Sequence, residues 1–108
     1  MLSKKNRADR KMVEKVFKEG KSLSLATFSF RFIVSPDTKT PQISVIVPKT
    51  LSKKAVDRNS LRRKGYLALK KFINNFPKEI IGVVVFKQYQ NDISIIEDDI
   101  KKIINKIN

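Results

Sequence analysis

The side chains best suited to chemistry are positively charged or amide groups that lie close together near the middle of the chain. They are Lys53, Lys54, Arg58, Asn59, Arg62, Arg63 and Lys64. A guanidinium group can bind a phosphate through two parallel hydrogen bonds, whereas an ammonium group binds it as a point charge. The set therefore predicts recognition of phosphate and sugar oxygens rather than bond cleavage.

The composition excludes most kinds of catalytic site. The chain has no cysteine, histidine or tryptophan, so it has no disulfides, no thiolate or imidazole metal ligands, and no catalytic triad that needs an imidazole base. One acidic cluster, Glu97, Asp98 and Asp99 with Asp92, lies at the predicted start of the last helix, where the helix dipole favours acids. We predict no catalytic residue and no metal site on this chain.

The positive charge is concentrated in two segments. The chain has 24 basic and 10 acidic residues, a net charge of +14. Residues 1–21 hold eight basic and three acidic residues, and residues 49–71 hold nine and one. Such a field on a small protein favours a polyanionic partner. Two solvated helix faces are the simpler alternative, although solubility alone favours charges of both signs interspersed.

The length fits a single domain spanning residues 1–108, because a chain of this size can bury one core only. No apolar run approaches the roughly 20 residues of a membrane span, and residues 1–7 lack the apolar stretch of a signal peptide. We therefore expect a cytoplasmic protein with no membrane partner and no small-molecule substrate.

Hydrophobic periodicity predicts the elements that must position the basic residues. A helix is expected over residues 9–19, with Asp9 as its N-cap and Gly20 ending it. Residues 27–34 alternate, which predicts a strand with its phenylalanines in the core, and residues 42–47 form a second strand.

The second half of the chain predicts a helix, a buried strand and a final helix. The helix runs from residue 55 or 56 to about residue 75, and the apolar run 80–86 suits a strand covered on both faces. Ser94 and Glu97 form a candidate capping box for a helix ending at Ile107. The predicted order is α-β-β-α-β-α, with one more short strand near Thr50.

A helical wheel for the central helix separates two adjoining arcs. The packing arc contains Leu61, Gly65, Ala68, Leu69, Phe72 and Phe76. The basic arc contains Arg58, Asn59, Arg62, Arg63, Tyr66 and Lys70. Because glycine costs about 1 kcal/mol inside a helix, Gly65 predicts a close approach of this helix to a sheet.

Residues 52–63 read Ser-Lys-Lys-Ala-Val-Asp-Arg-Asn-Ser-Leu-Arg-Arg. This string resembles the basic signature of the bacterial ribonuclease P protein subunit, Ala-Val-x-Arg-Asn-x-x-Lys/Arg-Arg-x-x-Arg. The resemblance continues through residues 7–20, 28–34, 43–49, 80–86 and 94–107, in order and without large gaps. It covers nearly the whole chain.

The resemblance implies a fold and a function. The fold is an α/β (α+β) two-layer sandwich of order α-β-β-(β)-α-β-α, ribosomal protein S5 domain 2-like, with a left-handed βαβ crossover that is an exception to the usual hand. The function is to assist ribonuclease P RNA in removing the 5′ leader from precursor tRNA, with Mg²⁺ held by the RNA and no cofactor bound by the protein. The alternative is a small basic RNA-binding protein of ribosomal type without a role in tRNA processing.

The resemblance also implies roles for particular residues. Those facing the ribonuclease P RNA are Arg58, Asn59, Arg62 and Arg63, with Lys53 and Lys54 adding phosphate contacts. Those lining a cleft for the single-stranded leader are Val13, Phe17, Ser29 and Arg31.

Three positions depart from the family pattern. Tyr66 replaces the last arginine of the signature, so this contact is expected to become stacking or a hydroxyl hydrogen bond, or to pass to Lys64. Val13 and Arg31 stand where aromatic residues are common, and a guanidinium can still stack on a base.

Overall fold

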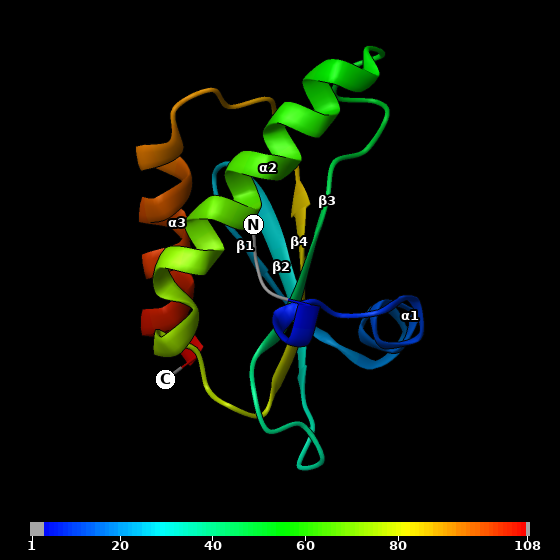
Figure 1. Ribbon diagram of the computed structural model, residues 1–108, viewed down its shortest axis with the longest axis vertical. Coiled ribbons are helices and arrows are strands. Elements are labelled where there is room, and N and C mark those ends of the chain that lie inside the picture. The colour runs from blue at the N-terminus through cyan, green and yellow to red at the C-terminus, as the bar shows by residue number, and fades with distance from the viewer. Residues whose placement is uncertain (1–3, 108) are drawn as a thin grey trace.

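Residues 4–107, described by a computed structural model, form a mixed four-stranded sheet with helices on both faces (Figure 1). The elements in chain order are η1 (Lys4–Asn6), α1 (Arg10–Glu19), β1 (Lys21–Ser24), β2 (Phe28–Val34), β3 (Gln42–Ile46), α2 (Ala55–Phe72), η2 (Ile73–Asn75), β4 (Ile80–Phe86) and α3 (Ile93–Ile107). None of the helices in this part of the chain is long and apolar enough to span a membrane.

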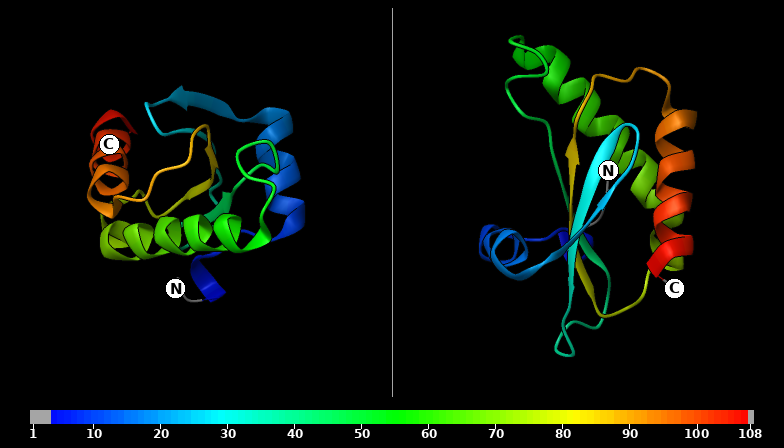
Figure 2. Two further views of the ribbon diagram at one scale, coloured as in Figure 1. Left: turned by 90° about the horizontal axis from the view of Figure 1, so that it is seen from above. Right: turned by 180° about the vertical axis from the view of Figure 1, so that it is seen from behind.

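The strand order is β1-β2-β4-β3, with β3 parallel to β4 and the other pairs antiparallel. The parallel pair is joined by α2, and the two views in Figure 2 show this crossover to be left-handed, as expected. The sheet with α2 and α3 forms the expected two-layer sandwich, and α1 covers the opposite face (Figure 2). Strand β4 is buried over almost its whole length, as its continuous apolar run predicts.

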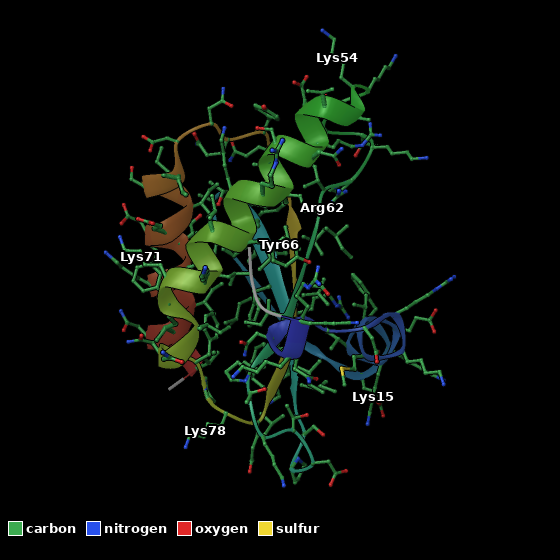
Figure 3. The ribbon with its side chains drawn as sticks, in the orientation of Figure 1. Lys15, Lys54, Arg62, Tyr66, Lys71 and Lys78 are labelled. Carbon is green, nitrogen blue, oxygen red and sulfur yellow. The ribbon has the colours of Figure 1, made fainter. Side chains whose placement is uncertain are left out.

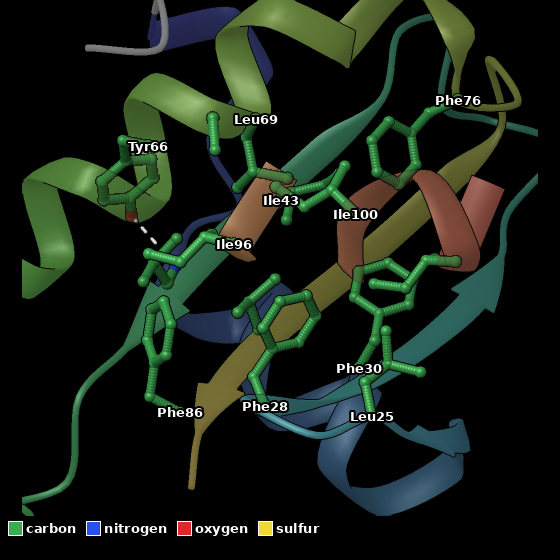
Figure 4. Packing of buried hydrophobic residues seen from close by; sticks show 14 of the residues in the cluster. Leu25, Phe28, Phe30, Ile43, Tyr66, Leu69, Phe76, Phe86, Ile96 and Ile100 are labelled. Atoms are coloured by element: carbon green, nitrogen blue, oxygen red, sulfur yellow. Dashed lines mark hydrogen bonds between the residues drawn. The ribbon is translucent and has the colours of Figure 1, made fainter. Parts of the chain in front are cut away.

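The main core lies between the sheet and the α2–α3 layer (Figure 4). Phe28 and Phe30 are fully buried in it, and the Phe28 ring meets Phe86 edge to face at 5.7 Å. Gly65 allows the close approach that its position predicts, because a Cβ atom there would lie 3.1 Å from both Phe86 Cε2 and Val45 Cγ1. The predicted packing arc of α2 therefore faces the sheet.

The additional strand is not where the sequence pattern placed it. Thr50 lies in a turn closed by the hydrogen bond from Leu51 N–H to Pro48 O, and the fourth strand is β1, which pairs with β2. β1 has only one apolar residue, Leu23, and lies at the exposed edge of the sheet. Its four residues are too short to show a period of two.

The start of α3 also differs from the predicted capping box. The helix begins at Ile93, and Asp92 accepts hydrogen bonds from the Ser94 hydroxyl at 2.6 Å and the Ser94 N–H at 2.9 Å. These two bonds hold the pKa of the Asp92 carboxyl below its ordinary value, and the bond from the Ser94 hydroxyl has the larger effect. Ser94 is therefore a donor to the capping carboxylate and not the cap itself.

Candidate nucleic-acid interface

The first turn of α2 is tied to the loop before it. Arg58 Nη1 donates to Ser52 O at 2.8 Å, and the Ser52 hydroxyl donates to Asp57 Oδ2 at 3.3 Å. The Lys54 N–H donates in turn to the Ser52 hydroxyl oxygen at 3.3 Å. These bonds place the Arg58 guanidinium against the loop and fix where the basic arc begins.

The next turns of α2 present an arginine-lined groove. Arg62 Nη1 donates to Asn59 Oδ1 at 2.8 Å, so the amide orients the guanidinium. The groove has a volume of about 310 Å³ and is lined by Asn59, Arg62, Arg63 and Tyr66. Among residues 4–107 the ion pairs are formed by other basic side chains, namely Arg10, Lys71 and Lys102. The signature arginines therefore have no carboxylate partner within this part of the molecule.

Tyr66 does not belong to the exposed basic arc. Its side chain is only 7% exposed and packs in the main core. Its hydroxyl accepts a hydrogen bond from the Val45 N–H of edge strand β3 at 3.2 Å (Figure 4). The wheel placed Tyr66 inside the basic arc, between Arg62 and Asn59, whereas the hydrogen bond to β3 holds its side chain in the core. The hydroxyl is committed to the sheet, and Tyr66 also lines the groove.

The lysines of the predicted set separate into two groups. Lys53 and Lys54 are exposed where α2 begins, and Lys54 marks one end of the long axis in Figure 3. Lys64 lies on another side of α2, where its ammonium donates to Asn91 Oδ1 at 3.2 Å beside the loop before α3. Lys64 is therefore turned away from the groove, and its expected replacement of the missing arginine stays a prediction.

A second groove adjoins the first across Tyr66. Its volume is about 440 Å³, and its lining residues are Lys4, Arg7, Ala8, Asp9, Met12, Gln42 and Tyr66. The segment before α1 is held to β3 by the Ser44 hydroxyl, which donates to Ala8 O at 2.8 Å. The two basic segments of the sequence thus meet on one surface. Sequence reasoning counted Lys4 and Arg7 as charge but could not bring them to Tyr66, because η1 has no periodicity.

The four predicted cleft residues gather on the sheet face that α1 covers. Val13 packs there with the buried Val16, and Phe17 beside them is 41% exposed. Ser29 and Arg31 lie on β2 at alternate positions, which direct side chains to the same face. The structure therefore brings Val13, Phe17, Ser29 and Arg31 to one side of the molecule.

Arg31 and Phe17 form a contact within this group. Arg31 Nη2 donates to Phe17 O at 2.9 Å, and the guanidinium carbon lies 5.4 Å from the centre of the Phe17 ring. The Nε atom of Arg31 is buried and has no hydrogen-bond partner among the described residues. The pair offers two planar groups next to each other, which suits stacking against an unpaired base.

No group of three or more acidic side chains within residues 4–107 is placed to hold a metal ion. The arrangement instead offers hydrogen-bond donors, positive charge and planar surfaces, which together suit binding of a nucleic acid.

Comparisons with known proteins agree with this arrangement. The family model Ribonuclease P matches residues 2–108. The ribonuclease P protein from Thermotoga maritima superposes with a TM-score of 0.81 at 22% identity, covering 94% of this chain and 97% of that one. A Staphylococcus aureus ribonuclease P protein mutant with defective mRNA degradation activity gives a TM-score of 0.80 at 16% identity, covering 94% and 86%. No curated protein sequence matches the chain.

Proposed function

The chain belongs to the ribonuclease P protein family, whose members work with RNA in a ribonucleoprotein, and we propose that it binds the catalytic RNA of that enzyme through Arg58, Asn59, Arg62 and Arg63. The observation that carries the proposal is the meeting of two basic segments around Tyr66, which forms adjoining grooves without ion-paired arginines. The family match favours this function over a ribosomal-type RNA-binding protein.

The geometry supports binding to a structured RNA backbone. Asn59 holds the Arg62 guanidinium in a fixed orientation, which lowers the entropy lost when that group binds a phosphate. Lys53 and Lys54 immediately precede α2 and extend the positive surface past the N-terminal end of the helix. Phosphate contacts of this kind fix the position of a protein on RNA and carry no sequence information themselves.

We assign the face under α1 to the single-stranded 5′ leader of precursor tRNA. A leader base can stack on Phe17 or Arg31, Val13 adds an apolar contact, and Ser29 offers a hydroxyl. The protein in this scheme binds and positions, while hydrolysis depends on Mg²⁺ held by the RNA. The lack of histidine and cysteine in the chain is consistent with that division.

Cleavage of precursor tRNA by a bacterial ribonuclease P RNA at low Mg²⁺, with and without this protein, tests the proposal. The intact protein is expected to stimulate cleavage, and Arg58→Ala with Arg62→Ala is expected to weaken assembly. Each lost phosphate contact lowers the slope of log affinity against log salt by about 0.7–0.9. Lys101→Ala with Lys106→Ala removes the same charge from α3 and is the matched control. Equal slopes for the two double variants would refute the assignment.

A further inference from the structure

A separate basic pocket lies between η1, the β2–β3 connection and the segment that follows α2. Its volume is about 170 Å³. Three stretches of chain that are far apart in the sequence each contribute one lysine to it. The lining residues are Lys5, Asn6, Lys39, Thr40, Pro41, Ile73, Asn74, Phe76 and Lys78.

The pocket is held in shape by contacts among the three stretches. Asn6 is 9% exposed, and its side-chain nitrogen donates to Pro41 O at 2.9 Å. The Thr40 hydroxyl donates to Lys5 O in a longer contact of 3.4 Å. Phe76 is buried in the main core, which anchors the segment after α2. The three lysines therefore project from a fixed frame.

The charge around the pocket has no acidic partner among the described residues. Lys5, Lys39 and Lys78 take part in none of the ion pairs within residues 4–107. Asp37 lines a different groove, with Lys15 and Glu19. Three like charges around one cavity repel one another, and a bound anion removes that repulsion. Lysine binds phosphate as a point charge, which fits a backbone contact of low geometric demand.

We propose that Lys5, Lys39 and Lys78 bind the phosphodiester backbone of RNA and extend the interface beyond the signature helix. The inference rests on the proposed function, since the occupant is the RNA that the arginine groove binds. RNA is the favoured occupant because the groove at Tyr66, lined by Lys4 and Arg7, adjoins this pocket at η1, where Lys5 follows Lys4. Lys78 and Lys54 lie toward opposite ends of the long axis (Figure 3), whose extent is 38 Å.

The test compares two triple variants of the full chain. The pocket variant carries Lys5→Gln, Lys39→Gln and Lys78→Gln, which remove the three charges of the pocket. The control variant carries Lys15→Gln, Lys101→Gln and Lys106→Gln, which remove the same charge from exposed positions of α1 and α3. All six side chains are exposed, so both proteins are expected to fold, as circular dichroism checks. Affinity for ribonuclease P RNA is measured as a function of salt, and binding to phosphatidylglycerol vesicles is measured in parallel.

The pocket variant is expected to lower the salt slope by about two, from two to three lost phosphate contacts, and the control is expected to leave it nearly unchanged. Equal slopes for the two variants would overturn the proposal. A loss confined to the vesicles would also overturn it, in favour of an anionic lipid surface. If Arg58→Ala with Arg62→Ala weakens RNA binding while the pocket variant does not, the pocket proposal fails and the proposed function stands.

Discussion

The substitution Tyr66→Phe separates a structural role of the tyrosine hydroxyl from a role in RNA contact. The hydroxyl accepts a hydrogen bond from the Val45 N–H, and both residues are less than a tenth exposed. Removing the acceptor leaves a buried donor unpaired, which costs about 1–3 kcal/mol. For a domain of this size, 1 kcal/mol corresponds to a shift in Tm of roughly 4–8 °C. We expect a lower Tm and an RNA affinity changed by less than about twofold.

Thermal unfolding followed by circular dichroism, together with RNA binding at one fixed salt concentration, measures both quantities. Tyr89→Phe is the matched control, because it removes the same atom from the other tyrosine of the chain, which is 37% exposed. The control is expected to leave both quantities unchanged. An unchanged Tm for Tyr66→Phe with a tenfold loss of affinity, about 1.4 kcal/mol, would mean that the hydroxyl serves RNA and not β3.

Two further substitutions test the cleft and the packing of the sheet. Phe17→Ala is expected to reduce affinity for leader-bearing precursor tRNA by about 1–3 kcal/mol, the usual value for one lost base stack. Affinity for mature tRNA is expected to stay unchanged. Equal losses for both RNAs would refute the assignment of the cleft to the leader. Gly82→Ala places a Cβ atom against the Phe30 ring, closer than real contacts allow, and is expected to lower the free energy of unfolding in a urea titration by about 1–3 kcal/mol. A wild-type urea midpoint for that variant would show that Phe30 moves aside freely.

The sequence predicted best where a long element had one strongly patterned face. The packing arc of α2 and the close approach at Gly65 are both present, because an 18-residue helix repeats its pattern over several turns. The strand 80–86 was predicted to the residue, since it is covered on both faces and its apolar run has sharp ends. Asp9 caps α1 as predicted, with the Met12 N–H donating to its carboxylate at 2.9 Å.

The sequence predicted least where a tertiary contact decides the position of a side chain. By its angle Tyr66 belongs to the basic arc, and its long side chain reaches inward to the Val45 N–H of β3, a partner that no local pattern reveals. Lys64 turns to Asn91, a residue 27 positions later that no local pattern connects to α2. The pocket at Lys5 and Lys78 depends on three stretches of chain meeting in space, which charge counts along the sequence do not reveal.

Strand β3 links the two proposed RNA-binding faces. Ser44 and Val45 are neighbours on this edge strand, and successive side chains of a strand point to opposite faces. The Ser44 hydroxyl binds Ala8 O just before α1, while Val45 contacts α2 through the Tyr66 hydroxyl and packs where Gly65 lets the helix approach. Two adjacent residues thus hold the segment before α1, which carries the proposed leader cleft, and α2, which carries the arginine groove. Because a shift of either helix would break a contact to the same strand, the sheet sets the distance between the arginine groove and the proposed leader cleft.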